Sequence, residues 1–189
     1  MEDVRKQLHS FFRSPPADCG MIASERALQL ELGLFLRTRN MAVDFERSLK
    51  ADRLPSSTLK KKHNLDLLVS SAGQRAGIEL KVPLNGQHPE TIYAFFADIE
   101  FLEAIKRAGM IDDGFAIMMT PDRAFWTDSG RGSPIHNLFR QPGSSVTGLI
   151  GKPTGARDSA VMIEGCYTVS GSWQDCGLLP HARFLLVEI

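Results

Sequence analysis

Two carboxylates and one ammonium group stand close together in a short part of the chain. Glu79 and Lys81 are two residues apart in the apolar stretch AGIELKV, and Asp66 lies in the earlier apolar stretch LDLLVS, with 12 residues between it and Glu79. Because side chains alternate between the two faces of a strand, Glu79 and Lys81 must share one face while their apolar neighbours point to the other. Three charged groups are therefore expected over one patch of sheet.

Such a patch favours metal-dependent chemistry. Two close carboxylates repel each other unless a cation or a proton lies between them, and Mg²⁺ and Mn²⁺ prefer carboxylate oxygens. A bound ion acidifies a water molecule and stabilises charge on a phosphoryl group. Lys81 would then orient the attacking water or stabilise the charge that develops on the phosphorus centre. The predicted reaction is hydrolysis of a phosphodiester.

The elements that must position these residues form a hairpin. Leu65–Ser70 and Ala76–Val82 are apolar enough to be strands, and the short link between them contains Gly73, which predicts an antiparallel pair. A turn centred on Ala72-Gly73 places Asp66 opposite Glu79. A register shift of one residue would move Asp66 to the other face.

The remaining pattern predicts an α/β domain built on a mixed sheet. Ser24 is expected to cap a helix that runs to about Arg39, with Leu28, Leu32 and Phe35 on its buried stripe. The other expected elements are a helix over 1–13, a strand over 41–49, a loop over 50–63, a helix over 90–108, a buried strand over 114–120, a region over 121–160 that is mostly loop, and strands over 161–169 and 182–189.

The motif Asp66…Glu79-Leu80-Lys81 resembles the D…(D/E)xK signature of the PD-(D/E)XK nuclease superfamily. The expected order of helix, strand, hairpin, helix and strand is also similar to that superfamily, over residues 22–120; Leu65 stands where many members have proline. The resemblance implies a restriction-endonuclease-like mixed β-sheet flanked by helices. It also implies a Mg²⁺- or Mn²⁺-dependent endonuclease, a hydrolase, in which Asp66, Glu79 and Lys81 are catalytic.

In that superfamily an acidic residue on the first helix often completes the metal site. Glu25 in ERALQLEL fits this role, and Glu31 on the same helix is the alternative. Glu25 is preferred because it lies on the stripe of Leu28 and Leu32. The predicted metal ligands are therefore Asp66, Glu79 and Glu25.

Length, composition and charge limit the partners. The 189 residues, 43% of them hydrophobic, fit one domain, 1–189, with the core at about 22–120 and a loop-rich elaboration at about 121–189. The net charge of zero gives no global field that attracts nucleic acid. The local run Lys60, Lys61 and Lys62 is the candidate contact to a nucleic-acid backbone, with DNA expected first. A homodimer would suit symmetric cutting of a duplex.

Three cysteines without a CxxC pair predict reduced thiols and a cytoplasmic protein. No apolar run approaches the roughly 20 residues of a membrane span, and the N-terminal segment lacks the apolar centre of a signal peptide.

Several other interpretations remain open. The three charged residues could form a salt bridge on an exposed sheet face, and Glu25 could be an ordinary first-turn acid. The whole chain could be a catalytically inactive nucleic-acid or protein-binding module, or a phosphohydrolase acting on small nucleotides. Asp98 and Glu100 are expected to be solvated, and Trp126 and Trp173 to pack loops onto the core rather than stack on bases.

Overall fold

The computed structural model describes residues 2–49, 64–84, 86, 88–127, 134–153 and 159–189. Its elements, in chain order, are α1 (Glu2–Arg13), α2 (Glu25–Thr38), β1 (Ala42–Ser48), β2 (Asn64–Ser71), β3 (Gln74–Lys81), α3 (His88–Arg107), β4 (Asp113–Thr120), the 3₁₀ helix η2 (Arg123–Phe125), α4 (Pro134–Arg140), β5 (Ser145–Gly151), β6 (Ala160–Thr168), β7 (Gln174–Asp175) and β8 (Arg183–Glu188). The predicted mixed α/β class is confirmed.

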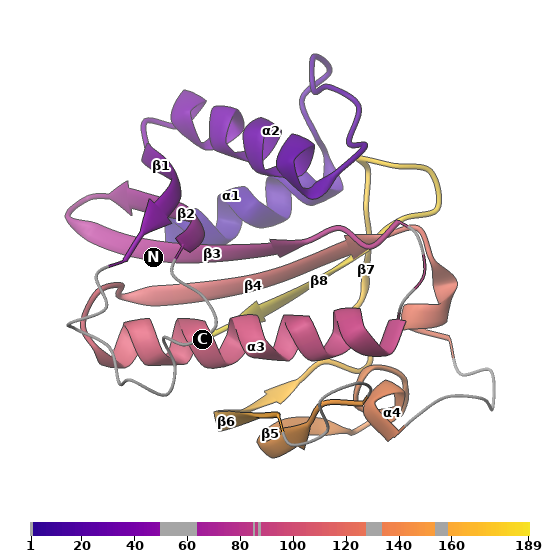
Figure 1. Ribbon diagram of the computed structural model, residues 1–189. Coiled ribbons are helices and arrows are strands. Elements are labelled where there is room, and N and C mark those ends of the chain that lie inside the picture. The colour runs from indigo at the N-terminus through magenta and orange to yellow at the C-terminus, as the bar shows by residue number, and fades with distance from the viewer. Residues whose placement is uncertain (1, 50–63, 85, 87, 128–133, 154–158) are drawn as a thin grey trace.

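The main sheet has six strands in the order β1-β2-β3-β4-β8-β7. β3 and β4 run parallel and are joined through α3, whereas all other neighbours in this sheet are antiparallel. α1 and α2 cover one face, and α3 covers the other (Figure 1). The separate β5–β6 hairpin and α4 pack on the far side of α3.

The two faces of the sheet bury two separate apolar clusters. The α1/α2 core includes Leu28 and Leu32 of α2 with Ile78 and Leu80 of β3. The α3 core includes Phe96 and Leu102 of α3 with Met118 and Leu185 of β4 and β8. Because both faces are covered, a polar side chain in the central part of β3 is enclosed by protein, whereas Gln74 and Arg75 at its start are exposed.

The hairpin between β2 and β3 forms as expected. Ala72 and Gly73 have φ angles of 51° and 79°, and two consecutive positive φ angles are typical of the type I′ turn that matches the twist of paired strands. The pairs Leu67↔Ile78 and Ser71↔Gln74 then fix the register. The predicted turn centre is therefore confirmed.

The expected loop over 121–160 is wrong for much of its described part. This part contains α4 and β5. Further along the chain, β8 pairs with β4 over six residues. β8, which lies within the strand expected over 182–189, is an inner strand of the main sheet. Among the described residues, no helix combines the length and apolarity that a membrane crossing requires.

Candidate active site

Asp66 and Glu79 lie at the end of the hairpin away from its turn. The last paired residues there are Leu67 and Ile78, so Asp66 and Glu79 are the next positions on the two strands. The carboxylate Oδ2 of Asp66 accepts a hydrogen bond from the backbone N–H of Leu80 at 2.8 Å. The Asp66 side chain is thus anchored between the two strands, next to the Glu79-Leu80-Lys81 segment.

Glu79 and Lys81 point toward α3. Ile78 and Leu80 belong to the α1/α2 core, so the alternation of the strand sends the two charged residues to the opposite face. Glu79 is only 1% exposed. The alternative of a salt bridge on an exposed face is therefore wrong: this face is covered, and a buried carboxylate requires compensation by hydrogen bonds or opposite charge.

Asp98 of α3 is a member of this cluster that the sequence interpretation left out. It is 3% exposed and forms an ion pair with Lys81, with 2.7 Å between Nζ and Oδ2. Lys81 also donates from Nζ to its neighbouring carbonyl, Leu80 O, at 3.0 Å. The expectation that Asp98 is solvated is incorrect, because α3 is buried nearly all round and not on one stripe only.

The close approach of α3 to β3 depends on two small residues. A Cβ added at Gly77 or at Gly114 would lie 3.2 Å from a Leu102 atom, so α3 rests almost directly on the backbones of β3 and β4. Asp98 lies one helical turn before Leu102, on the same side of α3. This packing brings the Asp98 carboxylate within reach of Lys81.

Glu25 approaches the cluster from the other helical layer. Ser24 caps α2 as predicted, since its hydroxyl accepts from Ala27 N at 3.1 Å, and Glu25 is the first residue of the helix. Burial raises the pKa of Glu25; Asp66 and Asp98 raise it further, while Lys81 and the backbone N–H of Val82 act in the opposite direction. Glu25 therefore lies within electrostatic range of the residues from the hairpin and from α3.

The alternative helix residue, Glu31, faces a different part of the protein. It interacts with Cys19, whose thiol pKa rises to about 11 through burial and through the nearby Glu31 carboxylate. Cys19 lies before α2, in the segment that connects it to α1. The structure therefore brings Glu25, and not Glu31, to the charged cluster.

Gln29 connects α2 to the backbone of Asp66. Its amide nitrogen donates to Asp66 O at 2.7 Å and to the Glu46 carboxylate at 3.1 Å. Gln29 lies one turn after Glu25 on the same helix face. The sequence interpretation did not assign it a role, although its position four residues after Glu25 indicated the shared face.

The predicted contacts to nucleic acid, Lys60, Lys61 and Lys62, lie outside the described residues. Their role stays a prediction. Trp126 and Trp173 lie within the described part, with ring centroids 5.3 Å apart, and both pack against the α3 core. Their expected packing is confirmed.

The carboxylate side chains of the candidate site are of the chemical type that binds a hard divalent cation. Glu25, Asp66, Glu79 and Asp98 bring carboxylates toward the end of β3 at which Lys81 lies, and carboxylate oxygens are the ligands that Mg²⁺ and Mn²⁺ prefer. In the residues that the structure describes, no three His, Cys, Asp or Glu side chains are grouped closely enough to hold an ion. Binding of a cation would therefore require side-chain rotation within the cluster.

Comparison of the chain with protein-family models, with curated proteins and with solved structures finds no match. The resemblance to PD-(D/E)XK nucleases therefore stays a prediction from the sequence motif. The observed order α2, β1, β2–β3, α3, β4 agrees with the order of elements expected from the sequence pattern.

Proposed function

We propose that the chain is a divalent-metal-dependent nuclease that hydrolyses phosphodiester bonds of nucleic acid, with DNA as the first expected substrate. The observation that carries the proposal is that Asp66 and Glu79 take neighbouring positions on the hairpin, with Lys81 two residues further on. Glu25 of α2 lies within electrostatic range of Asp66 and Lys81. A bound Mg²⁺ or Mn²⁺ would supply an acidified water and stabilisation of phosphoryl charge. Asp66, Glu79 and Glu25 would hold the ion.

The protein residues have separate tasks in this scheme. The hydrogen bond from Leu80 N fixes one carboxylate oxygen of Asp66, and burial makes the Glu79 carboxylate a strong electrostatic partner for a cation. Lys81 supplies the positive charge that balances a phosphoryl group as negative charge develops on it. The ion pair with Asp98 holds the Lys81 ammonium on the α3 side of the sheet.

Cleavage of plasmid and oligonucleotide substrates by the purified chain in Mg²⁺ or Mn²⁺ tests the proposal. We expect Asp66→Asn and Glu79→Gln each to lower the rate by about 100-fold or more, a loss typical of groups that stabilise the transition state electrostatically. Glu31→Gln is the matched control on α2 and should cleave at the wild-type rate, whereas Glu25→Gln should not. Wild-type cleavage by Glu79→Gln would refute the assignment.

A second function has two observations in its favour. Lys81 is already paired with Asp98. Among the described residues, no three metal-binding side chains are grouped closely enough to hold an ion. Both features are expected of a binding module that has lost catalysis. That module would bind a nucleic acid or a protein without cleaving it. It predicts no Mn²⁺ binding by isothermal titration calorimetry, whereas the nuclease predicts binding that Asp66→Asn abolishes.

A further inference from the structure

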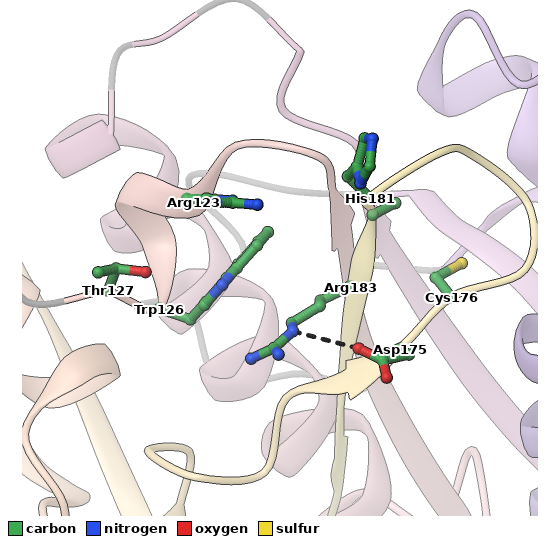
Figure 2. Close-up of a pocket in the computed structure, with 8 residues that line it drawn as sticks. Arg123, Trp126, Thr127, Asp175, Cys176, His181 and Arg183 are labelled. Atoms are coloured by element: carbon green, nitrogen blue, oxygen red, sulfur yellow. Dashed lines mark ion pairs between the residues drawn. The ribbon is translucent and has the colours of Figure 1, made fainter.

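A cavity of about 740 Å³ lies beside the candidate active site and is not part of it. Its lining includes Arg123, Trp126 and Thr127 after β4, and Asp175, His181 and Arg183 around the start of β8. Figure 2 shows Trp126 and Arg123 on one side and His181 and Asp175 on the other, with Arg183 between them. Two arginines, a histidine and an indole ring thus surround one hollow.

The sheet register places this cavity at the same end of the sheet as Lys81. β3 and β4 are parallel and end at Lys81 and Thr120, and Thr120 pairs with Arg183 at the start of β8. Arg183 also shares a strand face with Leu185 of the α3 core, which is the face to which Lys81 points. Two strand spacings, about 10 Å, separate β3 from β8.

The wall that carries Trp126 is firmly anchored. Asp122 caps η2 by accepting from Ala124 N at 2.9 Å and contacts His88 at 2.6 Å. Arg140 of α4 donates from Nε to Ala124 O at 2.7 Å, and Phe125 is fully buried. The backbone that carries Trp126 is therefore already fixed before a ligand binds, and this lowers the entropy cost of binding.

The charges in the cavity favour an anion. Arg183 lies with its guanidinium 5.5 Å from the Trp126 ring centroid, and its Nε is 3.4 Å from the carboxylate of Asp175. That carboxylate is 94% exposed, and such a solvated ion pair contributes little stability. A phosphate can replace it, because a guanidinium offers five donors in a planar fork that suits phosphate oxygens.

We infer that this cavity is a subsite for a nucleic-acid strand that extends from the active site, with Arg123 and Arg183 contacting phosphates and Trp126 contacting a base. The inference rests on the proposed function for its substrate class. Arginine forks recognise the backbone, and an indole ring stacks on any base, so the subsite positions a strand without reading its sequence.

Binding of short fluorescein-labelled single-stranded DNA and RNA, measured by anisotropy in EDTA, separates this subsite from catalysis. We expect Arg123→Gln and Arg183→Gln each to raise Kd about tenfold, the usual loss for one charge-assisted contact. Trp126→Ala should raise it by a similar factor, and its thermal unfolding shows whether it is folded. Arg123 is exposed, so its variant keeps the test valid even if Trp126→Ala unfolds.

Asp175→Asn provides a gain of affinity that misfolding cannot imitate. Removing this negative charge should lower Kd two- to fivefold, because the ion pair between Arg183 and Asp175 no longer has to break before Arg183 binds a phosphate. Arg107→Gln is the matched control: Arg107 ends α3, about 28 Å along the helix from His88, and its loss should leave Kd unchanged.

Absence of oligonucleotide binding by the wild type, or wild-type affinity in Arg123→Gln and Arg183→Gln, would overturn the subsite. Failure of the proposed function looks different: binding that depends on these arginines would persist, while no metal-dependent cleavage would be seen. If instead cleavage depends on Glu79 but Arg123→Gln has the same KM as the wild type, the proposed nuclease function is supported and the proposed subsite is wrong.

Discussion

Glu25 carries a negative charge at a position where the folded protein disfavours it. Burial raises its pKa, and although Lys81 and the backbone N–H of Val82 lower the pKa while Asp66 and Asp98 raise it, the net shift is upward. A raised carboxyl pKa means that the folded state binds a proton more tightly than the unfolded state does. Stability is therefore lost as pH rises through the window between the ordinary and the raised pKa, and the full penalty remains above it.

Glu25→Gln removes this penalty and should stabilise the protein at neutral pH in EDTA. The gain should be below about 1 kcal/mol because Glu25 is partly exposed and solvent screens it. It should shrink as pH falls below the ordinary pKa of a glutamate, where the wild-type residue is protonated in both states. Urea unfolding of the two proteins across this pH range measures it; a larger advantage for Gln at low pH than at neutral pH would contradict the sign.

The Lys81–Asp98 pair is expected to be the strongest coupled pair of the candidate site. Breaking a buried ion pair by removing one partner typically costs about 3–5 kcal/mol, because the other charge remains buried. We expect Asp98→Leu to destabilise the protein by about 3 kcal/mol, and Lys81→Met/Asp98→Leu to be more stable than the sum of the single changes predicts, with a coupling of about 2 kcal/mol.

A double-mutant cycle by urea unfolding measures this coupling. The exposed pair Arg5–Glu188, 3.3 Å apart, is the matched control and should couple by less than about 1 kcal/mol. Additive effects of the two changes at Lys81 and Asp98, within about 0.5 kcal/mol, would show that the ion pair does not contribute as proposed.

At the scale of elements, the hairpin was predictable and the position of α3 was not. The alternating residues of β3 and the Ala72-Gly73 turn are local signals, and they fix the register that places Asp66 beside Glu79. The approach of α3 depends on Gly77 and Gly114, two glycines whose lack of a side chain matters only once Leu102 is known to lie over them. Asp98 was missed for that reason: its partner is 17 positions away, on another element.

The missed elements of the C-terminal part also have a physical explanation. β5 has only two buried residues, Val146 and Ile150, and its pairing with β6 is interrupted between Val146 and Gly148, where Gly148 has a φ of 73°. The period of two that identifies a strand is therefore lost. α4 spans only seven residues, too few to show a helical pattern.

Glu103 fastens the β5–β6 hairpin to α3, which gives this missed region a specific anchor. Its buried carboxylate accepts from Glu164 N at 2.9 Å, Gly165 N at 2.7 Å and Tyr167 Oη at 2.9 Å. Glu103→Ala leaves the two backbone donors without this acceptor and should cost about 2–3 kcal/mol.

Hydrogen exchange should show the loss locally, as lower protection of the amides in β6 than in β3 or β4. Glu100→Ala is the control: Glu100 accepts a single bond, from Met162 N at 2.8 Å, in an exposed position, so its loss should cost less than about 1 kcal/mol. Equal effects of the two substitutions on β6 protection would rule out Glu103 as the main anchor.

At the scale of the whole molecule, the C-terminal part belongs to the central architecture. β8 pairs with β4 and contributes Phe184 to the α1/α2 core and Leu185 and Val187 to the α3 core. The motif-bearing segment 22–120 therefore lacks an inner strand by itself. The same strand begins with Arg183, so the element that completes the sheet also brings the cavity to the end at which Lys81 lies.

The zero net charge of the chain sets how nucleic-acid binding should depend on salt. Without a global positive field, affinity comes from the few phosphates that local side chains contact, and each contact to a single strand adds about −0.7 to the slope of log Kobs against log[salt]. The two cavity arginines should therefore supply a slope of about −1.4, and Lys60, Lys61 and Lys62 would add up to about −2 if they also meet phosphates.

Anisotropy titrations of the oligonucleotide over a range of salt concentrations test this partition. The Arg123→Gln/Arg183→Gln double variant should have a slope shallower by about 1.4, and replacing all three lysines by glutamine should make it shallower by up to about 2 if they meet phosphates. Trp126→Phe should raise Kd without changing the slope, because a stacking contact releases no counterions. An unchanged slope in the arginine double variant would place the phosphates elsewhere on the protein, since a chain with zero net charge has no global positive field that could replace the two arginines.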